Sequence, residues 1–329
     1  ALSEADCVLP IVPMFHVNAW GMPYASVLVG AKLVMPGPHL DPASVIEDFE
    51  QEKVTFTAGV PTVFLAVLQA LDKEQGKHDL SALRAMAIGG SAVPKGVIKA
   101  FDERHGLKVV HAWGMTEMSP IGSVANLPTP VREQSENEQL EYRAKQGYPV
   151  PLVEIRARGD EGFVPWDGES MGELEVRGPW VASSYYEAPE GADKFTDDGW
   201  FKTGDIVTID EYGFIKIMDR SKDLIKSGGE WISSVDLENA LMAHPAVSQA
   251  AVIAIPHEKW DERPLAAIVL KEGESVTEDE LRDHLAKDFA KFWLPDAYEF
   301  VESIPMTATG KFQKLKLREQ FEGYTSAKG

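Results

Sequence analysis

The stretch HAWGMTEMSP, residues 111–120, decides which fold the chain is expected to have. It follows the apolar run LKVV at 107–110 and predicts a buried strand that breaks at Gly114. After the break, a hydroxyl and a carboxylate stand side by side at Thr116 and Glu117. In chains that alternate strands and helices, ligands bind at the loops that follow the strands. The stretch therefore predicts an α/β fold whose ligand site includes this loop.

Short apolar runs alternate with helix-length segments from the first residue to about residue 114. Strands are expected at 8–12, 32–35, 55–58, 84–88 and 108–113. Helices are expected between them at 19–29, 41–52, 61–71 and 94–104. The last two segments open with proline, which favours a first helical turn. This alternation predicts a mainly parallel sheet with helices on its faces.

The pattern changes in the second half of the chain. Residues 128–147 are polar and are expected to form a surface excursion, after which strands and turns dominate up to a hairpin at 205–220. Helical and strand patterns beyond Arg220 then indicate a separate small domain. The expected fold class is α/β: the remainder of a large domain with a β-rich subdomain, then a small α+β C-terminal domain. The expected boundaries are 1–218, a hinge at 219–224, and a mobile domain at 225–329.

Composition limits the partners and the location. The chain has 329 residues, 44% of them hydrophobic, which is enough for two domains with cores of their own. Its 32 basic and 52 acidic residues give a net charge of −20, which disfavours nucleic acid and anionic membranes as partners. Cys7 is the single cysteine, stands in an apolar run and is expected in the core. The sequence has no apolar stretch of membrane-spanning length and no secretory signal pattern, so we expect no membrane insertion and a cytoplasmic location.

Five polar clusters that contain glycine carry the candidate chemistry. They are GGSAVP (89–94), WGMTE (113–117), FKTGD (201–205), DRSKDLIKSGGEW (219–231) and MTATGKFQK (306–314). Each one alone has an ordinary explanation, such as a plain strand-to-helix turn for GGSAVP. That cluster is not a hydrolase nucleophile elbow, because Val93 stands where a glycine is needed. TATGK is not a Walker phosphate loop, because Phe312 replaces the serine or threonine that would hold magnesium.

Taken together and in this order, the clusters resemble the adenylate-forming superfamily of acyl-CoA synthetases, peptide synthetase adenylation domains and luciferases. PMFHVNAW (13–20) makes the chain most similar to the fatty acyl-CoA synthetases. The resemblance implies an acid–thiol ligase that activates a carboxylic acid with ATP and Mg²⁺ to an acyl-adenylate. The acyl group then passes to coenzyme A, and pyrophosphate and AMP are released. The acid, ATP and coenzyme A are the implied partners, and we expect a homodimer.

The resemblance also assigns roles to individual residues. Glu117 is implied to bind magnesium, which prefers carboxylate oxygen, and Thr116 to contact phosphate. Asp205 would accept the ribose hydroxyls and Arg220 would reach the ribose and phosphate. Lys311 would stabilise the negative charge that builds up when the acid attacks the α-phosphate. The nucleotide- and coenzyme-binding set implied is Gly89, Gly90, Ser91, Trp113, Gly114, Met115, Thr116, Asp205, Arg220, Lys222, Lys226, Gly228, Gly229 and Trp231.

Two further features follow from the resemblance. The small domain is implied to rotate about Lys222 between the two steps, which brings the loop 227–230 to the active site with room for pantetheine beside its glycines. His16, Trp20 and Pro61 are expected to line the entrance for the acid, with Trp20 as its gate. Trp113 is expected beside the adenine, where the family often has tyrosine. The two entrance aromatics could instead be ordinary core residues.

Several alternatives stay open at this point. The substrate is expected to be a medium- or long-chain fatty acid, while a short thioether acid such as 3-methylmercaptopropionate, or an aryl acid, is also compatible. Transfer to a carrier protein or to oxygen is another option. A different class, a non-catalytic adenylate- or acyl-binding module, is disfavoured because Glu117, Asp205, Arg220 and Lys311 are all present. The family's Thr/Ser/Gly-rich phosphate loop is not found in the sequence, so the chain is expected to be a fragment that lacks an N-terminal portion.

Overall fold

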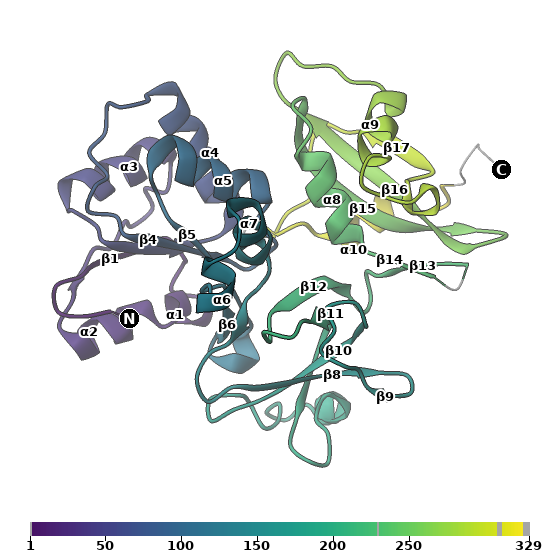
Figure 1. Ribbon diagram of the computed structural model, residues 1–329, viewed down its shortest axis with the longest axis horizontal. Helices are drawn as coiled ribbons and strands as arrows, with labels where there is room; N and C mark the ends of the chain where they lie inside the picture. The colour runs from purple at the N-terminus through teal and green to yellow at the C-terminus, as the bar shows by residue number, and fades with distance from the viewer. Residues whose placement is uncertain (1, 229, 308–310, 325–329) are drawn as a thin grey trace. The chain divides into compact units, whose positions relative to one another are not determined.

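The computed structural model describes residues 2–228, 230–307 and 311–324 (Figure 1). The chain divides into two compact units. The first holds Ala1–Thr203 and Thr208–Lys216, and the second holds Gly204–Val207 and Ile217–Gly329. Among the described residues, no helix combines the length and the apolar character needed to cross a membrane.

A seven-stranded sheet with the order β2-β1-β3-β4-β5-β6-β7 forms the centre of the first unit. Its strands are β1 Cys7–Pro10, β2 Lys32–Leu33, β3 Phe56–Gly59, β4 Ala85–Gly89, β5 Val109–Gly114, β6 Ile121–Val124 and β7 Tyr148–Pro149. Strands β1 to β5 pair in parallel, and β6 and β7 add to the edge in antiparallel fashion. The five predicted strands are all present, and the prediction of a mainly parallel sheet is confirmed.

Helices cover both faces of this sheet (Figure 1). They are α1 Val17–Trp20, α2 Met22–Val29, α3 Pro42–Gln51, α4 Pro61–Lys73, α5 Lys95–His105, α6 Thr129–Arg132 and α7 Glu136–Ala144. Alternate residues of a strand point to opposite faces, and β1 follows this rule. Leu9 packs in a core with α3, α4 and α5, whereas Val8 packs in a second cluster with Ala19 and Met22.

Two predictions about the first unit can be compared with the structure in more detail. The polar segment 128–147, expected to be a surface excursion, contains α6 and α7, and none of the residues of α7 is buried. Ser135 and Glu138 form a capping box that starts α7. The helix predicted at 19–29 is interrupted, because α1 is a left-handed turn and the regular helix begins only at Met22.

The β-rich portion forms a five-stranded sheet with the order β12-β11-β10-β8-β9. Its strands are β8 Glu154–Gly159, β9 Gly162–Phe163, β10 Gly172–Arg177, β11 Phe201–Ile209 and β12 Ile215–Arg220. The predicted hairpin between β11 and β12 is present, and Gly213 donates its backbone N–H to the Asp210 carbonyl at 2.8 Å. Short 3-10 helices stand at η1 Thr116–Met118, η2 Pro189–Lys194 and η3 Lys291–Trp293.

The second unit is an α+β structure with a core of its own. Its sheet has the order β14-β13-β16-β15, with β17 paired to β16. The elements are β13 Ile225–Ser227, β14 Glu230–Ile232, α8 Ser234–Met242, β15 Val247–His257, β16 Asp261–Leu270, α9 Glu278–Leu285, β17 Ala297–Phe300 and α10 Lys314–Gln320. Ser233 caps α8, and Thr277 with Glu280 forms the predicted capping box of α9. The predicted fold class, with a β-rich portion and a small α+β domain, is confirmed.

Candidate active site

The carboxyl ends of β4 and β5 lie side by side at one edge of the first sheet. Parallel pairing places Gly89 opposite Ala112. A Cβ atom at Gly89 would lie 2.4 Å from the Ala112 carbonyl oxygen, so only glycine fits there. The next residue, Gly90, has φ +87° and turns the chain toward Ser91. Gly89 is buried, and its missing side chain lets the backbone of β5 and the Trp20 indole pack closely against β4.

Trp20 lies at the same edge. Its Cη2 atom is 3.4 Å from the position that a Gly89 Cβ would take, and its indole is only partly buried. The turn that carries it is unusual, because Val17, Asn18, Ala19 and Trp20 all have φ between 46° and 54°. Left-handed backbone costs about 1–2 kcal/mol for each non-glycine residue. Such conformations persist where surrounding packing enforces them, often beside ligand sites.

The other two residues expected at the acyl entrance also belong to the first unit. His16 precedes the left-handed turn as the N-cap of α1, and Pro61 opens α4 directly after β3. Both are partly exposed. Their predicted contact with the acid stays a prediction.

Strand β5 ends at Gly114 for a steric reason. A Cβ atom at Gly114 would lie 2.0 Å from the Pro120 carbonyl oxygen, which the Met115 N–H uses as a hydrogen-bond acceptor at 2.9 Å. The chain therefore leaves β5 in a tight turn and enters η1. In that short helix Thr116 is exposed and Glu117 is partly exposed to solvent.

A tyrosine that the sequence analysis did not predict holds Glu117. The Tyr185 hydroxyl donates a hydrogen bond to Glu117 Oε1 at 2.7 Å. Partial burial, together with this bond, raises the pKa of Tyr185 to about 12, so the hydroxyl keeps its proton at neutral pH. The ring packs edge-on against Phe195 and Phe201. The only sequence signal was the pair of tyrosines within the polar segment SSYYEAPE, residues 183–190.

The donor set around Glu117 fits a magnesium ion that is shared with phosphates. No group of three His, Cys, Asp or Glu side chains is placed to hold a metal ion anywhere in the described ranges. Magnesium rarely needs such a group, because it keeps several waters and is usually bound by one or two carboxylates plus substrate phosphates. One partly exposed carboxylate in a loop after a strand is therefore an adequate protein contribution.

Trp113 and His111 occupy the face of β5 that points into the protein. Trp113 is 8% exposed, and its ring fills the space above Gly122, where a Cβ atom would come within 2.4 Å. Its predicted packing beside adenine stays a prediction. His111 is fully buried, and its Nδ1–H donates to the Ala144 carbonyl at 3.0 Å. Burial lowers the pKa of His111 to about 4, although hydrogen bonds with the backbone of Ala144 and Ser91 act in the opposite direction. The ring is therefore neutral.

The second unit brings together Asp205, Arg220 and Lys311. Arg220 Nε lies 2.6 Å from Asp205 Oδ1, and the Asp205 side chain is only 2% exposed. Burial lowers the pKa of Lys311, the positive charge of Arg220 lowers it further, and the negative charge of Asp205 partly opposes both effects. The Thr307 N–H donates to the Lys311 carbonyl at 2.8 Å, and the Lys311 N–H donates to Thr307 Oγ1 at 3.1 Å. Beside them, Met306 and Phe312 form an isolated antiparallel bridge.

The predicted hinge and coenzyme loop also belong to the second unit. The Lys222 carbonyl accepts a hydrogen bond from Arg318 of α10, and Arg318 forms an ion pair with Asp223 at 2.6 Å. Lys226 and Trp231 face each other in the β13–β14 pair. Gly228 follows with φ +60°. Gly229 lies outside the described residues.

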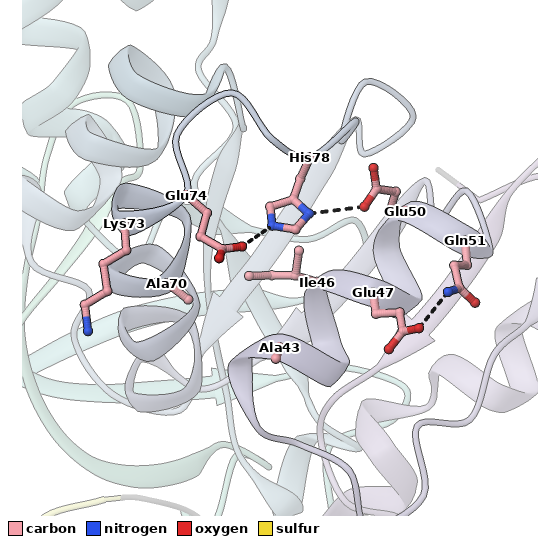
Figure 2. A pocket seen from close by; sticks show the side chains of 9 residues that line it. All are labelled: Ala43, Ile46, Glu47, Glu50, Gln51, Ala70, Lys73, Glu74 and His78. Carbon is pink, nitrogen blue, oxygen red and sulfur yellow. Dashed lines mark hydrogen bonds and ion pairs between the residues drawn. The ribbon is translucent and has the colours of Figure 1, made fainter.

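A surface pocket between α3 and α4 is separate from these residues. Figure 2 shows His78 between two carboxylates, with its ring nitrogens 3.1 Å from Glu50 and 3.0 Å from Glu74. The pocket is lined by Ala43, Ile46, Glu47, Glu50, Gln51, Ala70, Lys73, Glu74 and His78. None of these was predicted as a site residue, and the pocket does not contain the strand ends at Gly89 and Gly114.

Comparison with known proteins identifies the family. A family model described as AMP-binding enzyme matches residues 1–186, and one described as AMP-binding enzyme C-terminal domain matches residues 236–311. The chain belongs to the AMP-binding enzyme family. The resemblance to adenylate-forming enzymes expected from the motifs is thus confirmed.

Three relatives illustrate the range of similarity. The long-chain-fatty-acid–CoA ligase of Thermus thermophilus is 55% identical over 98% of this chain. The 3-methylmercaptopropionyl-CoA ligase of Ruegeria lacuscaerulensis is 46% identical over 97%. The crystal structure of ATP-bound MatB from Rhodopseudomonas palustris matches 98% of the chain with a TM-score of 0.85 and 26% identity. The chain spans 60%, 59% and 62% of the lengths of these three proteins.

Proposed function

We propose that the protein is an AMP-forming acyl-CoA synthetase, an acid–thiol ligase that uses ATP, Mg²⁺ and coenzyme A. The arrangement of Lys311 beside the Asp205–Arg220 pair is the observation that carries the proposal. A carboxylate and a guanidinium held 2.6 Å apart offer an acceptor for ribose hydroxyls and a donor for phosphate next to the candidate catalytic ammonium. Family membership and the ligase relatives support the same activity.

In the first step, an oxygen of the substrate carboxylate forms a bond to the α-phosphorus of ATP, and the bond to pyrophosphate breaks. Negative charge builds up on the phosphate oxygens, and a positioned ammonium such as Lys311 stabilises it. Glu117 and Thr116 would face the phosphates. A magnesium ion bound by Glu117 would neutralise phosphate charge.

In the second step, the coenzyme A thiol attacks the acyl carbonyl, a thioester forms, and AMP leaves. We propose that a rotation about the 219–224 segment brings the loop 227–230 to the active site for this step. The domain boundaries at 1–218 and 225–329 belong to the same proposal. The homodimer and the cytoplasmic location stay predictions.

The preferred substrate class is a medium- or long-chain fatty acid, since the 55% identical relative is a long-chain ligase. A short thioether acid such as 3-methylmercaptopropionate is the second candidate, because a 46% identical relative acts on that acid. An apolar wall separates acids that differ by one methylene by only about 1–3 kcal/mol, so sequence similarity alone does not choose between them.

The test measures pyrophosphate and AMP release by the full-length protein, with and without coenzyme A. The acids run from acetate to palmitate and include 3-methylmercaptopropionate. We expect Lys311→Ala to abolish adenylate formation but still convert a supplied acyl-adenylate to thioester. Lys316→Ala, which removes an exposed lysine of α10, is the matched control. Release of neither product with any acid would support the non-catalytic binding module instead, and product formation without any need for coenzyme A would support another acceptor.

A further inference from the structure

The tip of the β15–β16 hairpin packs over the turn at 226–228, where β13 ends. A Cβ atom placed on Gly228 would lie 2.6 Å from Cε3 and 3.0 Å from Cζ3 of Trp260. Gly228 also has φ +60°, in the left-handed region. The indole therefore occupies the open face of the glycine, and no larger residue fits there without moving the tryptophan.

Backbone contacts join the same two segments. The Gly228 N–H donates to the Trp260 carbonyl at 2.9 Å. The Lys226 N–H donates to the Glu262 carboxylate at 2.8 Å. Between them, Ser227 pairs with Asp261 in antiparallel fashion. Three successive residues of the turn are thus fixed by three successive residues of the hairpin tip.

The hairpin tip is itself held in place. His257 Nδ1 accepts the backbone N–H groups of Lys259 and Trp260, at 3.1 and 3.3 Å. The Lys259 ammonium lies 4.6 Å from the centre of the Trp260 ring, within the range of a cation–π contact.

Below the tip, the buried Arg263 connects the turn to the rest of the unit. It donates to Ser227 Oγ at 2.9 Å and pairs with Asp296 at 2.9 Å. Trp260 itself remains 42% exposed. Its contacts therefore stabilise the turn at 226–228 more than the core of the unit.

We propose that Trp260 is a positioning residue for thioester formation: it holds the turn at 226–228 in the conformation that receives coenzyme A. The inference rests on the proposed function, in which the loop 227–230 belongs to the coenzyme site. Without the indole, Gly228 gains access to more backbone conformations. The loop must then be ordered when coenzyme A binds, and that ordering reduces the efficiency of the second step.

The kinetic test separates the two half-reactions in the full-length protein. Trp260→Ala is expected to lower kcat/KM for coenzyme A, with a supplied acyl-adenylate, by about tenfold to a hundredfold. Pyrophosphate release without coenzyme A should stay within about twofold of wild type. Trp260→Phe keeps a ring over Gly228 and should restore most of the loss. Phe292→Ala is the matched control, because Phe292 is a similarly exposed aromatic of the same unit.

A second measurement does not depend on activity. Amide hydrogen exchange of Lys226 and Gly228, without substrates, should be faster in Trp260→Ala than in wild type and unchanged in Phe292→Ala. A raised KM for coenzyme A with unchanged exchange would mean that Trp260 touches the coenzyme, and would overturn the positioning role. Equal loss of both half-reactions with a lowered melting temperature would make the role structural. Absence of pyrophosphate release from wild type would overturn the proposed function, while the exchange result would still decide whether Trp260 holds the turn.

Discussion

Arg220 Nε lies 2.6 Å from Asp205 Oδ1, and this ion pair sets the electrostatic surroundings of Lys311. Burial lowers the pKa of the Lys311 ammonium, Arg220 lowers it further, and Asp205 partly compensates. A lysine in this position is protonated over a narrower pH range than an exposed one. The site therefore has a pH dependence that a plain surface lysine would not produce.

The first prediction concerns that pH dependence. As pH rises through the lowered pKa, the ammonium is lost, so adenylate formation should decline at a lower pH than an ordinary lysine would give. Lys311→Arg keeps its charge at every accessible pH, and its residual activity should lack this alkaline decline. The measurement is kcat/KM for ATP from about pH 7 to about pH 10, which reports groups of the free enzyme. An unchanged decline in Lys311→Arg would assign the ionisation to another group.

The second prediction concerns the carboxylate at the opening motif. Glu117→Gln keeps an oxygen that can accept the Tyr185 hydroxyl, so the loop should keep its shape while the anionic ligand is lost. Activity should drop, and the magnesium concentration for half-maximal pyrophosphate release should rise about tenfold or more. Tyr185→Phe is the control, since it removes the hydroxyl and keeps the charge. An unaltered magnesium requirement in Glu117→Gln would make Glu117 a structural residue.

The sheet and the edge that carries the candidate site could be predicted because their signals are local. Buried parallel strands are short continuous apolar runs, and the glycines at 89 and 114 mark where such runs end. Helix α7 was not predicted, because its residues have no buried apolar stripe. The Ser135–Glu138 capping box at its start was the available sequence signal. Hydrophobic periodicity does not distinguish a helix without such a stripe from a polar loop.

Other features depend on the folded structure and could not be predicted. Tyr185 is 68 residues from Glu117 in the sequence, and nothing local pairs a hydroxyl with a carboxylate over that separation. The left-handed turn contradicts intrinsic preference, since Val17 and Trp20 ordinarily avoid positive φ. Packing of Ala19, which is fully buried, accompanies the strained conformation. Local propensity therefore predicted one regular helix at 19–29 where the chain forms two elements.

The third prediction concerns His78, which lies outside the candidate site. Its hydrogen bonds to Glu50 and Glu74 raise the pKa of His78, and the same bonds contribute to lowering the pKa of each carboxyl (Figure 2). A raised folded-state pKa stabilises the protein below the unfolded-state value of about 6.5, and the stabilisation is lost as pH rises through the folded value.

His78→Gln should therefore reduce the free energy of unfolding more at about pH 5.5 than at about pH 9. Chemical denaturation at both pH values measures the difference. His39→Gln, in the exposed segment before α3, is the control. A loss of equal size at both pH values would show that His78 acts through packing and not through its charge.

The fourth prediction concerns the proposed hinge. Proline at position 222 fixes its own φ near −65° and restricts Ser221 to extended conformations. Lys222→Pro should therefore obstruct rotation, sparing adenylation and suppressing thioester formation if the fixed orientation is that of the first step. Lys222→Ala removes the same side chain but leaves the backbone free, and should impair thioester formation less than Lys222→Pro does. Equal loss of both half-reactions in Lys222→Pro, with an intact circular dichroism spectrum, would place the hinge elsewhere.

The fifth prediction concerns Trp20, whose indole lies against Gly89 at the end of β4. Two roles are possible for a partly buried indole on a strained turn, and they differ in what its removal changes. As a core residue, Trp20 would contribute packing, and Trp20→Ala would cost up to about 3–5 kcal/mol and lower activity on every acid alike. As a gate, it would admit the acyl chain and exclude water, so its removal would act on substrate choice.

We expect the gate, because the left-handed turn at 17–20 holds the indole at the strand edge and leaves it partly exposed. In Trp20→Ala, the preference among acids of different chain length should shift while the melting temperature changes little. Trp20→Phe, which keeps an aromatic ring beside Gly89, should shift that preference less. Thermal melts and an activity profile across acids of different chain length, measured on the same preparations, distinguish the gate from the core role. A large fall in melting temperature with an unaltered profile would assign Trp20 to the core, and the acyl entrance would then have to be sought around His16 and Pro61 alone.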